Sequence, residues 1–119
     1  MALIFESKLD IKSMISILRK KIPNIEWRMG DSEYDGFYVL GRTKDRIKIK
    51  ITEEDEPGKY FLGIYFYSTN HAFDPVRRQQ VNLVLQRRIM QAIGAQNGKR
   101  KYLARYLVKK CMNKLFKWR

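Results

Sequence analysis

Arg46-Ile47-Lys48-Ile49-Lys50-Ile51-Thr52 is the most regular stretch of this sequence, because an isoleucine occupies every second position. Side chains of a β-strand point alternately to its two faces, so the three isoleucines share one face and the cations share the other. The pattern therefore predicts a strand that packs its isoleucine face on a core and turns Lys48 and Lys50 outward.

Turn signals and further strand patterns lie on both sides of this stretch. On its N-terminal side we expect strands over 25–29 and 37–43, joined by the turn-rich loop 30–36. On its C-terminal side the loop 53–58 contains Pro57-Gly58 and leads into a strand over 59–67. Because the loops are short, the four strands are predicted to form an antiparallel meander.

Helical periodicity flanks the predicted strands. Residues 10–22 repeat apolar side chains every three or four positions, with Ser7 or Asp10 as the N-cap and Pro23 as the stop. A second helix begins at Asp74-Pro75 and its pattern breaks over 95–98. Residues 98–119 are predicted to form a third, basic and amphipathic helix, whereas residues 2–6 form either a leading strand or an extension of the first helix.

These elements predict an α+β fold. We expect an antiparallel four-stranded meander with one N-terminal and two C-terminal helices in a two-layer sandwich. The length of 119 residues is typical of one domain, so we assign 1–119 to a single domain with 1–94 as its core. No apolar run is long enough for a signal peptide or a membrane span, which predicts a cytoplasmic protein.

Charge is distributed unevenly along the chain. The chain has 25 Lys and Arg against 12 Asp and Glu, a net charge of +13. Residues 1–60 hold 12 cations and 11 acids, whereas residues 61–119 hold 13 cations and one acid, Asp74. Such asymmetry is typical of a surface that meets a polyanion, although a basic surface kept for solubility is the simpler alternative.

The second half supplies the candidate binding residues. Residues 99–119 contain nine cations, no acid and interleaved tyrosines, a pattern that suits phosphate neutralisation and base stacking. The residues that we predict to bind nucleic acid or another anionic partner are Arg77, Arg78, Arg87, Arg88, Lys99, Arg100, Lys101, Tyr102, Arg105, Tyr106, Lys109 and Lys110. A weaker indication is the outward face of the sheet, where Tyr65 and Tyr67 could stand beside Lys48 and Lys50.

Catalytic and metal-binding patterns were sought in the acidic segments. The Asp31, Glu33 and Asp35 cluster lacks the full calcium-loop pattern, and the acids of 53–56 do not match a nuclease motif, so both are interpreted as solvated loops. His71 is the single histidine and Cys111 the single cysteine, and both are interpreted as structural. We therefore expect no enzyme activity, no cofactor and no metal.

Two function classes follow, with a third less favoured. The leading hypothesis is a small non-enzymatic protein that binds nucleic acid, RNA slightly ahead of DNA, through a basic helical face. The alternative is an inhibitor of an acidic protein partner, such as a toxin immunity protein, an antitoxin or a phage-type blocker, with Tyr65, Tyr67, Tyr106 and Trp118 as anchors. Attachment of residues 99–119 to an anionic membrane surface is the third hypothesis.

Overall fold

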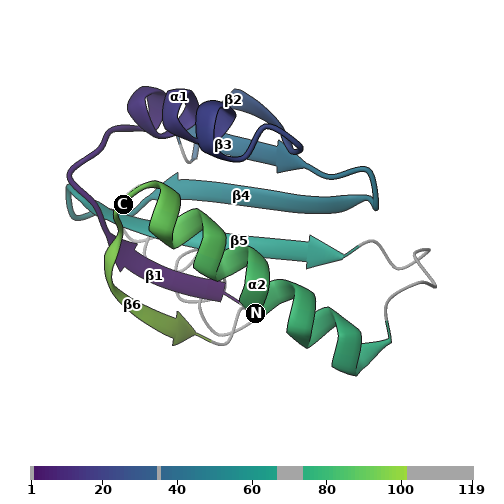
Figure 1. Ribbon diagram of the computed structural model, residues 1–119. Helices are drawn as coiled ribbons and strands as arrows, with labels where there is room; N and C mark the ends of the chain where they lie inside the picture. The colour runs from purple at the N-terminus through teal and green to yellow at the C-terminus, as the bar shows by residue number, and fades with distance from the viewer. Residues whose placement is uncertain (1, 35, 67–73, 102–119) are drawn as a thin grey trace.

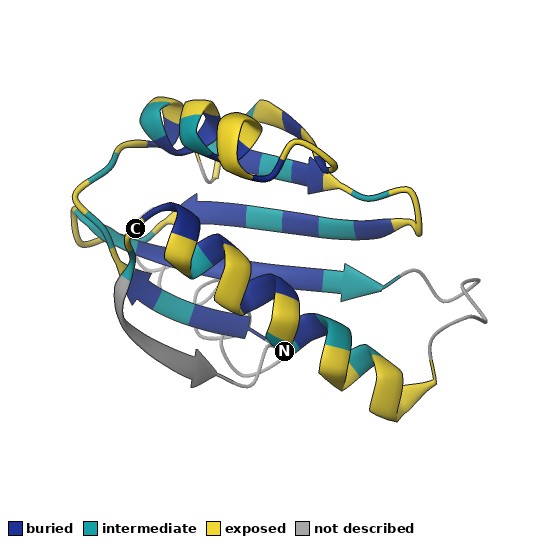
Figure 2. Cartoon of the chain, in the orientation of Figure 1, coloured by how far each residue is buried: buried dark blue, intermediate teal, exposed yellow. Residues whose placement is uncertain are grey.

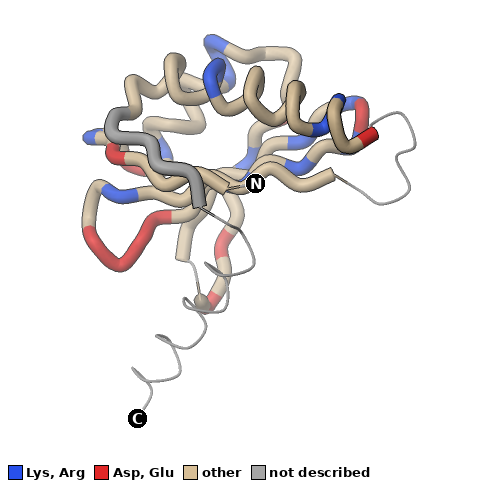
Figure 3. The backbone as a smooth tube through the Cα atoms, turned by 90° about the horizontal axis from the view of Figure 1, so that it is seen from below, with Lys and Arg blue, Asp and Glu red and all other residues tan. Residues whose placement is uncertain are grey.

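The computed structural model describes residues 2–34, 36–66 and 74–101, and for 96–101 it describes the backbone. Six strands form one antiparallel sheet in the order β2-β3-β4-β5-β1-β6, and α1 and α2 both lie on one side of it (Figures 1 and 3). The predicted α+β class is thereby confirmed. The elements in chain order are β1 (Ala2–Glu6), α1 (Ile11–Lys21), β2 (Glu26–Ser32), β3 (Gly36–Arg42), β4 (Ile47–Glu53), β5 (Lys59–Phe66), α2 (Pro75–Ala92) and β6 (Gln96–Lys101).

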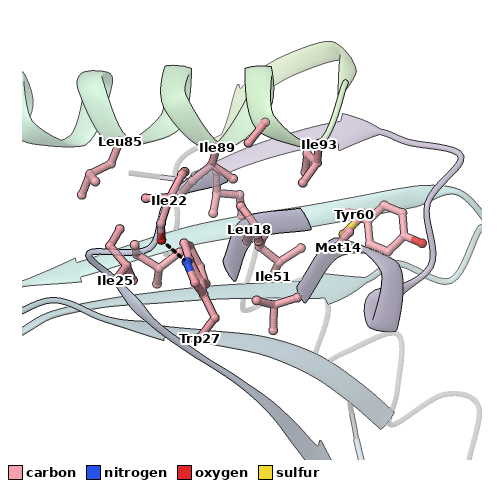
Figure 4. Close-up of a cluster of buried hydrophobic side chains, with 14 of the residues drawn as sticks. Met14, Leu18, Ile22, Ile25, Trp27, Ile51, Tyr60, Leu85, Ile89 and Ile93 are labelled. Atoms are coloured by element: carbon pink, nitrogen blue, oxygen red, sulfur yellow. Dashed lines mark hydrogen bonds between the residues drawn. The ribbon is translucent and has the colours of Figure 1, made fainter. Parts of the chain in front are cut away.

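The predicted meander is β2-β3-β4-β5, and its central strand β4 packs as its alternation requires. Ile47, Ile49 and Ile51 are buried against the helices, and Ile49 pairs with Gly41 of β3 and Ile64 of β5. The Trp27 ring occupies the space beside Gly41, which has no side chain. A Cβ atom at position 41 would lie 2.6 Å from the ring. The Trp27 indole N–H donates to the Ile22 carbonyl at 3.0 Å, which joins β2 to the end of α1 (Figure 4).

Helix α1 is held at both of its ends. Of the two predicted N-cap candidates, Ser7 and Asp10, the cap is Asp10, and its carboxylate accepts a hydrogen bond from the Ser13 backbone N–H at 2.8 Å. This backbone hydrogen bond lowers the pKa of Asp10. Near the C-terminus, the Arg19 guanidinium donates to the Trp27 carbonyl from Nε at 3.2 Å and from Nη2 at 3.0 Å. Arg19 thus ties the end of the helix to the edge strand β2.

Strand β1 and strand β6 extend the sheet beyond the predicted meander. Residues 2–6 are a strand that pairs with β5, which decides between the two alternatives left open by the sequence. Residues 96–101 form β6 and pair with the other side of β1, so the predicted helix over 98–119 is wrong for 98–101. The physical reason is that β1 would otherwise be an edge strand with unpaired backbone groups. Residues 102–119 lie outside the described residues, as do His71 and Cys111.

Helix α2 starts as predicted. Asp74 is its N-cap and accepts from the Arg77 backbone N–H at 2.8 Å, and Pro75 occupies the first turn. The helix ends at Ala92, after which Gly94 adopts a φ of +62° that turns the chain toward β6. Leu85 and Ile89 are buried on the sheet (Figure 4), whereas no residue of 75–81 is buried. Neither described helix has the length and apolar composition needed to cross a membrane.

Tyr60 links β5 to the loop before α1. Its ring stacks on Phe5 with centroids 5.7 Å apart, and its hydroxyl donates to the Leu9 carbonyl at 2.6 Å. Burial, helped by the nearby Glu53 carboxylate, raises the pKa of Tyr60 to about 12.

We predict that Tyr60→Phe lowers the free energy of unfolding at pH 7 by about 1 kcal/mol, because the Leu9 carbonyl loses its donor. Above its ordinary pKa of 10.0, Tyr60 ionises in the unfolded chain before it ionises in the folded protein. Wild-type stability should therefore fall from pH 10 toward pH 12 by more than that of Tyr60→Phe. Urea titrations at pH 7, 10 and 11.5 measure this, and parallel pH profiles for the two proteins would contradict it.

Candidate anion-binding surfaces

Cations gather on the sheet face that points away from the helices. The outward positions of β2, β3 and β4 follow from the register, in which Arg42 pairs with Lys48 and Leu40 pairs with Lys50. Arg28 and Arg42 are exposed, and Lys48 and Lys50 are half-buried. We call this group the outer sheet patch, which consists of Arg28, Arg42, Lys48, Lys50 and Tyr38.

Tyr38 supplies the aromatic ring of the outer sheet patch. The ring lies flat on Gly30 of the neighbouring strand, where a Cβ atom would overlap it. The Lys50 ammonium lies over the ring, 4.5 Å from its centroid. Such a cation–π contact at a partly exposed site contributes about 0.5–1 kcal/mol. The ring and the ammonium are therefore held together on an open sheet face, but only weakly.

The outer sheet patch carries little negative charge of its own. At the outward positions of β2, β3 and β4, Glu26 is the single carboxylate, and it pairs with Arg28. Arg42 and Lys48 face each other across the β3–β4 pair, and Tyr65 pairs with Lys48 from the other side. Like charges on neighbouring strands repel, so an external anion would stabilise this arrangement.

The same sheet face becomes apolar toward β5 and β1. Ala2, Phe61 and Thr52 are buried there, and the Tyr65 ring rests against Gly63, where an added Cβ would lie 2.6 Å from the tyrosine hydroxyl. This boundary confines the outer sheet patch to β2, β3 and β4. Farther along, the backbone register places Lys99 beside Ile4 and Lys101 beside Ala2. Tyr67 lies outside the described residues.

The four predicted arginines of α2 do not form one continuous positively charged surface. Arg77 and Arg88 lie within about 20° of each other around the helix axis, and both are exposed. Arg87 is exposed too, whereas Arg78 points to the opposite side and its guanidinium carbon lies 5.9 Å from the Phe66 ring centroid. The structure thus brings together Arg77 and Arg88 and turns Arg78 toward the sheet.

Acidic groups of the helical layer are used for capping. Asp10 and Asp74 are the N-caps of α1 and α2, and each accepts a backbone N–H. Within the described ranges, no carboxylate pairs with Lys20, Arg87 or Arg88. Figure 3 shows the other acidic residues mainly at strand ends and in loops. The exposed side of α2 is accordingly a second cationic surface, separated from the outer sheet patch by the sheet.

The acidic segments do not assemble into a metal site in the part of the chain that the structure describes. Glu56, in the loop before β5, pairs with Lys59 at 2.7 Å. Of the other predicted binding residues, Lys99, Arg100 and Lys101 are described by their backbone in β6. Tyr102, Arg105, Tyr106, Lys109, Lys110 and Trp118 lie outside the described residues.

Sequence reasoning missed Arg28 and Arg42 as members of a charged surface. Arg28 is one position from the buried Trp27 and Arg42 is three positions from the buried Val39, so the alternation places both arginines on the outward face. What the sequence did not supply was the register between the strands, which places Arg28 and Arg42 in line with Lys50 and Lys48.

Neither a scan of protein-family models nor a search of curated proteins finds a match to this chain.

Proposed function

We propose that this protein binds single-stranded nucleic acid without catalysis, RNA ahead of DNA, through the outer sheet patch. The observation that carries the proposal is the outer sheet patch itself, where four cations and a flat tyrosine share one sheet face with a single, paired carboxylate. Cations neutralise phosphates and release counterions, and an aromatic ring on a sheet can stack on an unpaired base.

The energetics favour an exchange of contacts at Tyr38. Stacking of one base on an aromatic ring contributes about 1–3 kcal/mol, which exceeds the cation–π contact that Lys50 makes with the free ring. On binding, Lys50 would leave the ring for a phosphate and the ring would receive a base. The residues predicted from the sequence on α2 and over 99–110 remain proposed contributors to the positive field that attracts the strand.

The alternative function, inhibition of an acidic protein, draws on a different surface. The exposed side of α2 presents apolar side chains beside its arginines, with Val76 66% and Val84 56% exposed. A mixed apolar and arginine surface is typical of a protein interface, whereas the outer sheet patch is not apolar.

The charge contribution predicts a specific loss. The triple variant Arg42→Gln, Lys48→Gln, Lys50→Gln should bind a 20-nucleotide oligouridine about tenfold more weakly at ~50 mM salt, and its salt slope should fall by about 2 units. A matched control, Lys12→Gln, Lys20→Gln, Lys21→Gln, removes the same charge from exposed positions of α1 and should change affinity little. Fluorescence anisotropy over a salt series measures both. An equal loss in the two variants would mean that net charge alone drives binding.

The position of the Tyr38 ring predicts a second loss of affinity, which does not depend on charge. Gly30→Ala should push the Tyr38 ring off β2, because the added Cβ overlaps the ring. We expect affinity for oligouridine to fall about five- to tenfold with an unchanged salt slope, as the loss of part of one stacking contact requires. Tyr38→Phe keeps a ring in place and should bind like wild type. If Gly30→Ala binds like wild type while circular dichroism shows a native fold, Tyr38 does not stack on a base.

A further inference from the structure

An open groove runs along the N-terminal half of α2. It encloses about 530 Å³, and the residues that line it are Asp74, Val76, Arg77, Gln80, Val81, Val84 and Leu85. We call this feature the α2 groove. Val76, Gln80 and Val84 recur every four residues and form a strip along one side of the helix, whereas Val81 and Leu85 lie beside this strip on the side that turns toward the core.

Val76, Gln80 and Val84 lie outside the core, whereas Leu85 belongs to the core and Val81 packs against it. Burial on α2 begins at Asn82, and the helix turns before it carry no buried side chain. Figure 2 shows this end of α2 as exposed and intermediate, in contrast to the buried face nearer its C-terminus. Val76 and Val84, on this side of the helix, are each more than half exposed to solvent. Exposed apolar strips of this kind mark interaction sites.

Apart from Asp74, the charged side chains of α2 near the strip are arginines. Arg77 and Arg88 lie on the same side of the helix, about three turns or 16 Å apart, with Val81 and Val84 between them. Asp74 is the one described acid of α2 and its flanks, and its carboxylate caps the helix. A nucleic-acid strand would use the arginines but not the valines, so the surface favours a protein partner with an apolar centre and acidic ends.

We propose that the α2 groove docks an acidic amphipathic helix of a partner protein. The partner's apolar side chains would pack on Val76 and Val84, and carboxylates about three turns apart would meet Arg77 and Arg88. Helix-in-groove recognition reads apolar anchors at helical spacing, which is the spacing that the strip offers. This inference does not depend on nucleic-acid binding by the outer sheet patch.

The test uses a synthetic probe and the full-length protein. The probe is a fluorescent 18-residue peptide with leucines along one helical face and glutamates elsewhere, and its control has the same composition in an order without a face. At ~150 mM salt, where long-range attraction is screened, we expect the amphipathic peptide to bind at least tenfold more tightly than the permuted one. Equal binding of the two peptides would overturn the proposal.

Variants localise the interaction. Val76→Ser with Val84→Ser should weaken the amphipathic peptide about tenfold, and Arg77→Gln with Arg88→Gln should weaken it and reduce its salt dependence. The matched control is Met29→Ser with Phe37→Ser, which removes two comparably exposed apolar side chains, 45% and 53%, from the β2–β3 hairpin and should leave binding unchanged. Loss in the control equal to that in the valine variant would overturn the assignment to α2. Loss of oligouridine binding in the valine variant would also overturn it, because the strip would then serve nucleic acid.

Discussion

The alternation of β4 is the constraint on which the rest of the structure depends. Ile47, Ile49 and Ile51 face the helices and are almost completely buried, and complete burial of such a side chain contributes about 1.5–3 kcal/mol. A register shift by one residue would bury Lys48 and Lys50 instead, so the isoleucines fix which face of the sheet is basic. Because β4 pairs with β3 and β5, it also fixes which residues of those strands join the cations. The burial of the isoleucines in the core therefore determines where the outer sheet patch lies.

Capping explains why the helical layer stays positive. Each described helix begins at an aspartate whose carboxylate accepts a backbone N–H, and neither helix has an acid in its first turn. The carboxylates that could pair with helix cations lie mainly at strand ends and in loops, where Glu56 pairs with Lys59 (Figure 3). In the part of the chain that the structure describes, Lys20, Arg87 and Arg88 therefore reach the surface of the helical layer without a paired carboxylate. Repulsion within such a surface is relieved when an anionic partner binds.

The sequence predicted those elements whose pattern is local. Helix α1, the four-strand meander and the start of α2 at Asp74 were predicted correctly, and Asp10 was one of two predicted caps of α1, because periodicity and capping are encoded within a few residues. Residues 98–101 were predicted wrongly as helix, since pairing of β6 with β1 is a contact between distant segments that a basic amphipathic pattern does not reveal. Two further features depend on tertiary packing in the same way. Arg78 points toward Phe66, and Arg28 and Arg42 lie on the same sheet face as Lys48.

The two cationic surfaces differ in chemistry as well as in position, and this difference argues for two kinds of partner. The outer sheet patch combines cations with a flat ring, whereas the α2 groove combines arginines with exposed valines. The two surfaces are separated by the thickness of the sheet and by the width of a helix, which alone is about 10 Å. Because the Debye length is about 8 Å at physiological salt, neutralising one surface leaves the field at the other nearly unchanged. Occupation of one proposed surface would therefore add little electrostatic penalty at the other, so a bound nucleic-acid strand and a bound acidic helix would not exclude each other by charge.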